Sequence, residues 1–383
     1  MTEIKIMMID PWGINNISLY INGLCSGISK YVDLTLITNY YYKTTTDAKY
    51  NIMPIFFRVS EKMSSGKLRK IIRGIEYIYS YKKIIKELKK NRYDIVHIQW
   101  LLQYKTDIHF LKRIKRYCKK IVYTAHNVVP HTNSDRYIDN LRTIYGLVDD
   151  IILHGEGVRE EFESLFGEFK NKVIIQGMAR MSQSTQYNTY SIKHEIIDKV
   201  EKYERVFLFF GNIFYNKGVD RLAKIWLENF NNSDQFLIIA GRKNTEFKEL
   251  DVLEADINKC NNILYINKYI EDNLLNYLIN KSDIILLPYR HASMSGVVFT
   301  AAEFKKTVLC TDVGSLVEYI TNNEDGFVVE STDELLCEKM KYISSEVTKE
   351  ELADMGKKLN RNITDKFSWD RIGEKLLTEC YEI

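Results

Sequence analysis

Short apolar runs that alternate with helical patterns limit the fold of this chain more than any other feature. The first half contains such runs at residues 4–9, 32–38, 94–98, 121–124, 150–153 and 172–175. The second half repeats the rhythm at residues 205–210, 236–240, 263–266, 284–287 and 308–310. Strands separated by helices form parallel βαβ units, with helices on both faces of the sheet. The sequence therefore predicts an α/β protein with doubly wound parallel sheets.

The alternation is interrupted once, between residues 178 and 204. This stretch is rich in Ser, Thr, Gln and Asn before it continues as a charged helical pattern. A chain of 383 residues also exceeds what a single core usually holds. We therefore predict two Rossmann-like domains, residues 1–180 and 181–365.

Composition excludes several classes of protein. With 45% hydrophobic residues, 27% charged residues and 4 prolines, the chain is neither disordered nor fibrous. No apolar run is long enough to cross a bilayer, and the N-terminus continues directly into a strand pattern, unlike a signal peptide. The six cysteines are scattered without a C-x-x-C pair, which indicates reduced thiols in a cytoplasmic protein.

Charge is distributed unevenly along the chain. Residues 1–180 contain 29 Lys and Arg against 18 Asp and Glu, a net charge of +11, whereas the remainder contains 25 against 33, a net charge of −8. This asymmetry indicates a first domain that faces an anionic surface or acceptor.

Residues 67–92 form the most basic segment, and Leu and Ile recur through it at helical spacing. One interpretation is an amphipathic helix that lies on anionic lipid. The other is a surface helix whose apolar stripe packs on its own sheet. Both hold if the stripe packs inward while the lysines face lipid.

The segment from residue 282 to residue 318 carries a pattern typical of phosphate binding. An apolar run ends in Pro288 and opens into a small polar loop, residues 291–296, before a helical pattern begins. The start of a helix carries about half a positive charge, and its N–H groups bind phosphate. Ser293 and Ser295 add hydroxyl donors, and Gly296 permits close approach. The alternative is an ordinary turn between strand and helix.

Small or polar residues end several strands of the second domain, and open α/β sheets bind ligands at that edge. These strand ends are Gly211-Asn212, Gly241-Arg242 and Pro288-Tyr289-Arg290. Lys217, Arg242 and Arg290 are therefore placed to reach one anionic group, beside the amides of residues 293–298. Each alone is typical of a solvated surface, but together they favour a diphosphate.

Two residues of the first domain follow strands in the same way. His126 follows the run at 121–124, so it is a candidate for a position beside the substrate, although a lone histidine is more often structural. Asp10 follows the first strand and is either a general base or a cap of the next helix.

Taken together, these stretches resemble one family, the bacterial glycosyltransferases of the GT-B fold, in particular the group-4 type that builds surface polysaccharides. The matching stretches follow the family's order: DIVHI (94–98), VYTAHNVVPH (122–131), IILHG (151–155), GNIFYNKGVDRL (211–222), a nucleotide-sugar segment (281–320) and FSWDRI (367–372). The resemblance implies two Rossmann-like domains that face a central cleft. It also implies that a C-terminal helix, residues 366–383, returns to the first, acceptor-side domain.

The resemblance also assigns roles to individual residues. The backbone near Tyr269 would meet the nucleobase, and His126 would lie beside the donor sugar. Lys217 and the loop of residues 295–298 would hold the donor diphosphate. The candidates for donor binding are Gly211, Asn212, Lys217, Arg242, Tyr269, Arg290, Ser293, Ser295, Gly296, Val297, Val298 and Glu303, and the catalytic candidates are His126 and Asp10.

The chain departs from the family pattern at two places. Many relatives carry two glutamates eight positions apart around the phosphate loop, where this chain has Ser293 and Ala301, with Glu303 two residues further on. The arginine that usually precedes the phosphate-binding lysine is absent. Arg242 or Arg290 is the candidate replacement.

The sequence thus predicts a glycosyltransferase that moves a sugar from a nucleoside-diphosphate sugar to an acceptor hydroxyl, with retention of configuration. The alternatives are an inverting enzyme with Asp10 as its base, a catalytically silent binding subunit and, more weakly, a nucleotide-sugar epimerase. No cofactor or metal is expected, because cations and a helix start can neutralise a diphosphate and no D-x-D motif ends a strand. The expected partners are the donor, a glycan or lipid-linked acceptor and an anionic membrane surface at the cytoplasmic face, but not nucleic acid.

Overall fold

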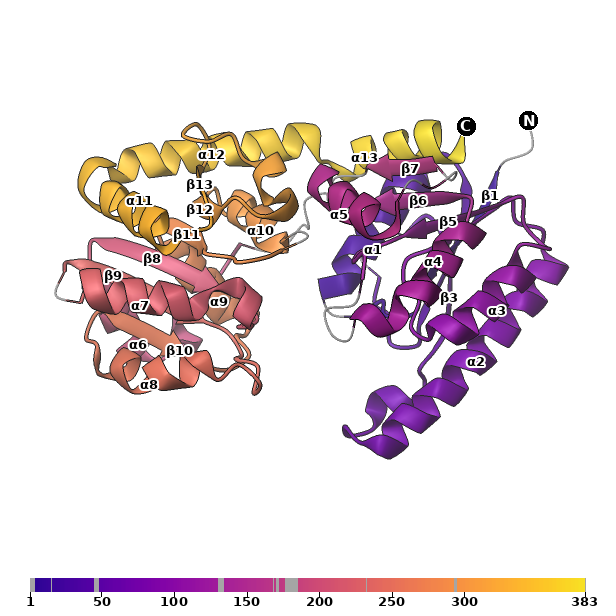
Figure 1. Cartoon of the computed structure of the whole chain (residues 1–383), viewed down its shortest axis with the longest axis horizontal. Helices are drawn as coiled ribbons and strands as arrows, with labels where there is room; N and C mark the ends of the chain where they lie inside the picture. Colours follow the sequence, from indigo (N-terminus) through magenta and orange to yellow (C-terminus); the bar gives the residue numbers. More distant parts are fainter. Residues whose placement is uncertain are drawn as a thin grey trace. The chain divides into compact units, whose positions relative to one another are not determined.

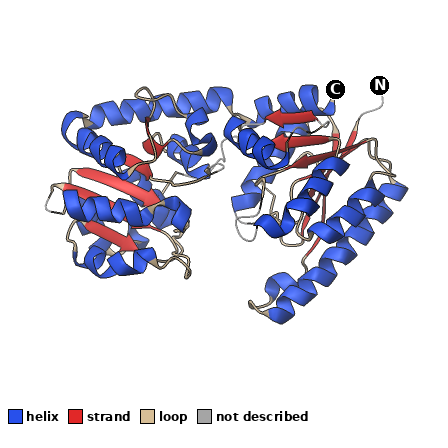
Figure 2. Ribbon diagram, in the orientation of Figure 1, coloured by secondary structure: helices blue, strands red, loops and turns tan. Residues whose placement is uncertain are grey.

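The computed structural model of the chain describes residues 4–14, 16–44, 48–129, 134–167, 169, 172–175, 185–231, 233–292 and 295–382. The chain divides into two compact units (Figure 1). Unit 1 comprises Met1–Met181 together with Phe367–Ile383, and unit 2 comprises Ser182–Lys366. The first passage between the units falls within residues 176–184, outside the described residues. Each unit is built on a single sheet surrounded by helices (Figure 2).

The sheet of unit 1 has seven described strands in the order β3-β2-β1-β4-β5-β6-β7, and every pairing is parallel. The strands are β1 (Lys5–Asp10), β2 (Asp33–Asn39), β3 (Asn51–Phe56), β4 (Ile95–Ile98), β5 (Lys120–Thr124), β6 (Asp150–Leu153) and β7 (Lys172–Ile175). The order reverses between β1 and β4. Open sheets of this kind bind ligands at such a reversal, outside the carboxyl ends of the strands, which we call the carboxyl edge.

Two layers of helices cover this sheet. They comprise α1 (Asn16–Ile28), α2 (Lys67–Lys90), α3 (Tyr104–Ile114), α4 (Ile138–Leu147), α5 (Glu156–Phe166), α13 (Trp369–Lys375) and a π-helical segment, η6 (Leu376–Tyr381). Because side chains alternate along a strand, Met7 and Ile9 of β1 belong to the core under α2–α5. Ile6 and Met8 belong to the core under α1 and the C-terminal helices.

The C-terminal helix packs tightly on α1. A Cβ added at Gly23 of α1 would collide with the Trp369 ring, and one added at Gly27 would collide with the Trp369 carbonyl oxygen. Lys30, beyond the end of α1, forms an ion pair of 2.6 Å with Asp370. Glycine one turn apart on α1 therefore allows the backbones of α1 and α13 to approach closely.

Unit 2 has a six-stranded parallel sheet in the order β10-β9-β8-β11-β12-β13. Its strands are β8 (Arg205–Phe210), β9 (Gln235–Ala240), β10 (Ile263–Ile266), β11 (Ile284–Leu287), β12 (Thr307–Thr311) and β13 (Phe327–Val329). Its helices are α6 (His194–Glu201), α7 (Val219–Asn229), α8 (Glu249–Lys259), α9 (Asp272–Lys281), α10 (Gly296–Glu303), α11 (Asp333–Glu346) and α12 (Lys349–Lys366). The order of the strands reverses between β8 and β11.

The predicted α/β architecture with two doubly wound parallel sheets is confirmed. The apolar runs predict neither β3 nor β13, the edge strands that the sequence misses. β3 is apolar after Asn51, but Pro54 interrupts it, and a proline within a run argues against a central strand. β13 is only three residues long.

Helix α2 differs from the expected inward-packed stripe. Its second half buries Ile84, Ile85 and Leu88, as expected, whereas its first half leaves Leu68 and Ile71 exposed. Leu68 and Ile71 lie on the side of the helix turned away from the buried face, so the apolar positions change face between the two halves. Within the described ranges, no helix combines the length and the apolar character needed to cross a membrane.

Candidate functional site

In unit 2, the loop after β8 carries Lys217 to the carboxyl edge. The loop ends in a single 3₁₀ turn, Tyr215–Lys217, followed by Gly218, which has the left-handed φ of 67°. A Cβ at Gly218 would also collide with the Pro288 carbonyl oxygen. Glycine is therefore required for the Lys217 loop to lie against the loop after β11.

Lys217 and the start of α10 meet through Tyr289. Lys217 Nζ lies 3.8 Å from the centre of the Tyr289 ring, and the Tyr289 hydroxyl lies 3.1 Å from Ser295 Oγ. Ser295 caps α10, since its Oγ accepts the N–H of Val297 at 3.3 Å. One aromatic side chain thus joins the cation to the helix start.

The charge of Lys217 is not balanced by any carboxylate of the described residues. Burial lowers the pKa of Lys217 to about 8. Among the described residues, Nζ has neither an ion-pair partner nor a hydrogen-bond acceptor, and it lies over the Tyr289 ring. A desolvated cation of this kind is stabilised when an anion binds beside it.

The start of α10 offers the complementary half of an anion site. The first helical residues, Gly296, Val297 and Val298, present backbone N–H groups at the positive end of the helix dipole. A Cβ added at Gly296 would meet nothing within 4 Å, so the space beside it is open. Ser293, also predicted to lie here, falls outside the described residues.

Arg290 is engaged within the protein instead of lying unpaired at the anion site. Its guanidinium binds both carboxylate oxygens of Asp220, at 2.6 and 2.7 Å, and donates to the Tyr215 carbonyl oxygen at 3.0 Å. Arg290 also lies over the Tyr215 ring, 4.4 Å from its centre. These contacts fix the Lys217 loop, so Arg290 positions the lysine.

The remaining donor-side candidates lie around the same edge. Gly211 and Asn212 follow β8, and both are exposed. Arg242 follows β9, is exposed and forms no ion pair with the part of the chain that the structure describes. Tyr269 follows β10 with 70% of its surface exposed.

Glu303 is poorly placed to replace a glutamate at Ala301. It is the last residue of α10, about 10 Å along the helix axis from Gly296. Two residues along a helix also turn the side chain by roughly 200°, so Glu303 faces away from the side occupied by Ala301, which is fully buried. Glu303 therefore lies at the opposite end of α10 from the N–H groups at the helix start.

At the carboxyl edge of unit 1, His126 belongs to a chain of hydrogen bonds. His126 Nε2 lies 3.1 Å from Gln99 Oε1, and His126 Nδ1 lies 3.0 Å from His154 Nε2. Gln99 Nε2 lies 3.1 Å from His97 Nε2, and His97 Nδ1 lies 2.6 Å from the Tyr381 hydroxyl. The chain therefore links the ends of β4, β5 and β6 to the C-terminal segment η6.

The protonation states of the histidines in this hydrogen-bonded series follow from their contacts. Burial lowers the pKa of His97 to about 3 and holds the pKa of His126 well below its usual value, with His154 adding to both effects. In neutral His126, Nε2 donates to Gln99 Oε1, so Nδ1 accepts from His154. The Trp100 ring stacks on His126 with their centres 4.3 Å apart.

Asp10 is placed at the same edge but points inward. It is 1% exposed, and its carboxylate accepts the N–H groups of Trp12 at 3.0 Å and Gly13 at 3.3 Å. Burial raises the pKa of Asp10 to about 7 despite these two hydrogen bonds. Its contacts are those of a residue that fixes the turn after β1.

The sequence interpretation missed the roles of Gln99 and Tyr289. Both follow strands, Gln99 after β4 and Tyr289 after β11, so the rule that selected His126 also applies to them. Glutamine and tyrosine are not residue types that by themselves indicate a site. Only the side-chain contacts show that Gln99 and Tyr289 connect the other residues of the two edges.

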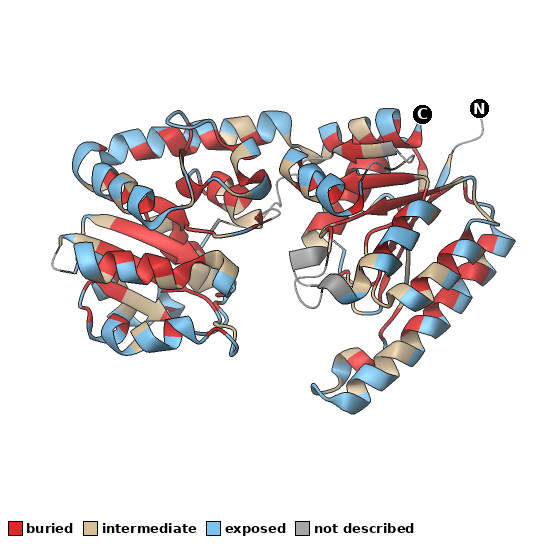
Figure 3. Ribbon diagram, in the orientation of Figure 1, coloured by how far each residue is buried: buried red, intermediate tan, exposed pale blue. Residues whose placement is uncertain are grey.

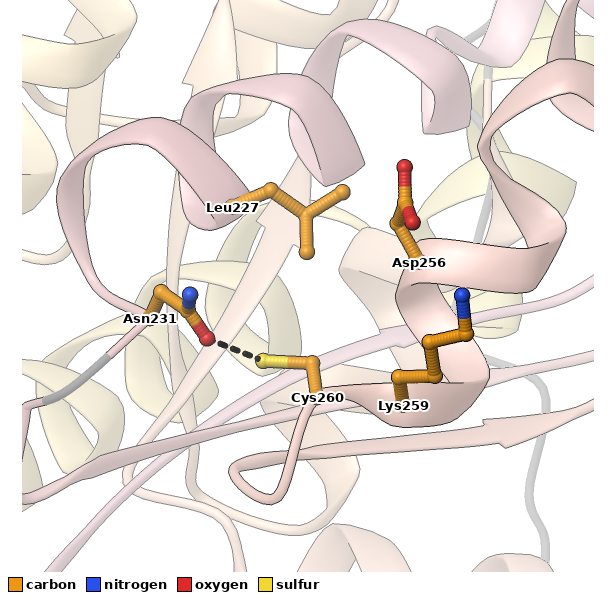
Figure 4. Close-up of a pocket in the computed structure, with 5 residues that line it drawn as sticks. All are labelled: Leu227, Asn231, Asp256, Lys259 and Cys260. Atoms are coloured by element: carbon orange, nitrogen blue, oxygen red, sulfur yellow. Dashed lines mark hydrogen bonds between the residues drawn. The ribbon is translucent and has the colours of Figure 1, made fainter.

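One cavity lies away from the carboxyl edges. It has a volume of about 310 Å³ and is lined by Leu227, Asn231, Asp256, Lys259 and Cys260 (Figure 4). Asn231 precedes β9 and Cys260 precedes β10, so the cavity lies near the amino ends of these strands. The Cys260 thiol donates to Asn231 Oδ1 at 3.1 Å, and burial raises the pKa of Cys260, which disfavours the nucleophilic thiolate form.

Comparison with known proteins identifies the class of the chain. Residues 192–361 match the family Glycosyl transferases group 1. The capsular polysaccharide biosynthesis glycosyltransferase CapM of Staphylococcus aureus is 26% identical over 240 residues, which cover 59% of this chain and 60% of CapM.

Solved structures share the fold at low sequence identity. Sucrose-phosphate synthase from Thermosynechococcus elongatus superposes with a TM-score of 0.72 at 11% identity, over 98% of both chains. HepE from Anabaena, in complex with UDP, superposes with a TM-score of 0.68 at 13% identity, over 99% of this chain and 100% of HepE. The chain is a glycosyltransferase with the GT-B fold, and most of its second unit matches the group 1 glycosyl transferases.

Proposed function

We propose that this glycosyltransferase uses a UDP-sugar donor and transfers the sugar, with retention of configuration, to a hydroxyl of a lipid-linked glycan of the surface-polysaccharide type. UDP is bound by HepE, which shares the fold, and polysaccharide synthesis is the activity in the name of the relative CapM. The single observation that carries the proposal is the unpaired Lys217 beside the start of α10.

The donor diphosphate fits between Lys217 and the N–H groups of Gly296, Val297 and Val298. Negative charge grows on the diphosphate as its bond to the sugar breaks. A fixed cation and helix-start amides in a desolvated position stabilise that charge more than they stabilise the intact donor. The Ser295 hydroxyl and the Tyr289 hydroxyl connect the two halves of this site.

Retention agrees with the state of Asp10. An inverting transferase needs a base that reaches the acceptor hydroxyl. Asp10 is 1% exposed, and both of its oxygens already accept backbone N–H groups. We therefore assign Asp10 to the turn after β1 and not to proton transfer.

His126 has the role of a neutral, fixed side chain beside the sugar. Both of its ring nitrogens are hydrogen-bonded within unit 1, so it neither carries a positive charge nor moves a proton freely. Its imidazole remains partly exposed at the carboxyl edge. We infer that it shapes the sugar position and that Gln99 and His154 hold its orientation.

Two measurements on the purified chain test the proposal. Titration with UDP, GDP and ADP should show saturable binding with a preference for UDP, and transfer from the matching nucleotide sugar should give a product with the donor's anomeric configuration by proton coupling. A catalytically silent subunit would show no transfer with any of a panel of donors and acceptors. Binding of GDP in preference to UDP would overturn the donor assignment. A product of inverted configuration would contradict retention and would require a catalytic base.

The proposal includes the place of action. A lipid-linked acceptor is held in a membrane, and we propose that the protein works on its cytoplasmic face, drawn there by the positive charge of residues 1–180.

A further inference from the structure

One face of α2 points away from unit 1 along the length of the helix (Figure 3). In the first half, this outward face consists of the exposed side chains of Leu68, Ile71, Ile75, Ile78 and Tyr79. In the second half, the same helical spacing continues with the exposed side chains of Lys82, Lys86, Lys89 and Lys90. The outward face is therefore apolar at one end and basic at the other.

The exposure in the first half is large. Leu68, Ile71 and Ile75 are 62%, 61% and 63% exposed. Contiguous apolar side chains in contact with water mark an interaction surface far more often than single ones do.

The first half is nevertheless fixed to unit 1. The Tyr77 hydroxyl donates to Asp107 of α3 at 2.8 Å, and Glu76 accepts the N–H groups of Val59 and Ser60 at 2.7 and 3.0 Å. Arg73 lies 4.6 Å from the centre of the Trp12 ring, in the turn after β1. The exposed residues are therefore presented on a fixed helix beside the carboxyl edge of unit 1.

The positive charge of α2 indicates the kind of partner that this face binds. Helix α2 contains nine Lys and Arg and two Glu, a net charge of +7. An anionic bilayer matches both halves of the face, because apolar side chains enter the boundary between headgroups and acyl chains while lysines keep their ammonium groups among the phosphates.

We propose that the outward face of α2 docks the protein onto an anionic phospholipid bilayer, with the helix lying in the plane of the interface. The reason for docking rests on the proposed function, since a lipid-linked acceptor has to reach the carboxyl edge of unit 1. The turn after β1 lies at that edge and contacts α2 through Arg73 and Trp12.

Sedimentation with vesicles tests the apolar half. The full chain should bind vesicles of phosphatidylglycerol and phosphatidylcholine and bind pure phosphatidylcholine at least tenfold more weakly. The double substitution Ile71→Ser and Ile75→Ser should reduce binding to the anionic vesicles by about tenfold. Val252→Ser is the matched control, because Val252 of α8 is 79% exposed but lies in unit 2; its binding should equal that of the unmodified chain.

The basic half is tested by charge and salt. Each of Lys82→Gln and Lys86→Gln should weaken binding by roughly fivefold at low salt, and the difference should shrink as salt is raised. If the unmodified chain stays in solution at low salt, or the serine variants bind as well as it does, the proposal is wrong. If those variants instead abolish self-association seen by ultracentrifugation, the face serves a second copy of the chain.

Donor hydrolysis in the absence of vesicles separates this proposal from the proposed function. The serine variants should hydrolyse a UDP-sugar at the rate of the unmodified chain while losing vesicle binding. Vesicle binding by a chain that handles no nucleotide sugar would support the docking face and contradict the enzyme assignment.

Discussion

The carboxyl edges of the two sheets have the same topology but differ in whether their polar groups have partners within the unit. In unit 1, the polar side chains are partnered within the unit: His126 between Gln99 and His154, and Asp10 with backbone N–H groups. In unit 2, Lys217 and the start of α10 lack a negative partner among the described residues. The difference supports the proposed division of roles. The edge of unit 2 stabilises the charge of the ligand, and the edge of unit 1 positions the sugar.

Replacing Lys217 should have the largest effect. Lys217→Met removes the one desolvated cation of the site, so kcat should fall by about 10²- to 10³-fold, the range typical for loss of a group that stabilises developing charge. Steady-state kinetics with the proposed UDP-sugar donor measures this. Lys224→Met is the control, since Lys224 of α7 is exposed and pairs with Glu228. A Lys217 variant with normal kcat would remove the contrast between the two edges.

Gly218→Ala should lower kcat/KM by roughly 10- to 100-fold, because a misplaced charged group loses most of its effect. The added Cβ would collide with the Pro288 carbonyl oxygen and displace the Lys217 loop. Gly167→Ala is a matched control: Gly167 has a similar φ of 73°, but a Cβ there meets nothing within 4 Å. Equal losses in both variants would show that backbone strain, and not the position of Lys217, is responsible.

The affinity for UDP should fall with rising pH, by about tenfold per pH unit above pH 8. Burial lowers the pKa of Lys217 to about 8, so the free site loses its charge above that pH, and UDP binding must restore the proton. Calorimetry in buffers of different ionisation enthalpy should detect proton uptake at pH 8.5. Uptake that persists in Lys217→Met would assign the titration to another group.

Gln99→Leu should have the smallest effect, a roughly fivefold loss of kcat with unchanged affinity for UDP. The substitution removes the acceptor of His126 Nε2–H and the donor to His97 without adding charge. Nitrogen-15 shifts of the His126 ring should report a change of tautomer or pKa. Gln99→Glu retains an acceptor for His126 and should retain more activity. Weaker UDP binding by Gln99→Leu would contradict the separation of roles between the edges.

The strands of both sheets could largely be predicted from sequence because buried parallel strands are continuous apolar runs. β3 was missed although its residues are mostly apolar, because Pro54 within the run argues against a strand and is tolerated only at the edge of a sheet. A single inward stripe does not describe α2, because Leu68 and Leu88 are twenty residues apart and lie roughly 160° apart around the helix axis. The apolar positions therefore change face between the two halves, and Leu68 is exposed while Leu88 is buried.

The positions of Lys217 and His126 at the carboxyl edges could be predicted, because each follows a strand. Their partners could not. Arg290 looks like any other cation after a strand until Asp220, in the first turn of α7, is seen to bind both arms of its guanidinium. The bridging role of Tyr289 depends equally on the approach of two loops that only strand order brings together.

The close packing of α13 on α1 has a consequence for biosynthesis. Ile372, Leu376 and Tyr381 complete the core beneath α1, yet the ribosome makes them only after all of unit 2. The nascent chain must therefore carry an unfinished first unit, with one apolar layer uncovered, until residues 367–381 have been translated. Unit 2 is contiguous and can mature before it is released, so the half synthesised first becomes native last.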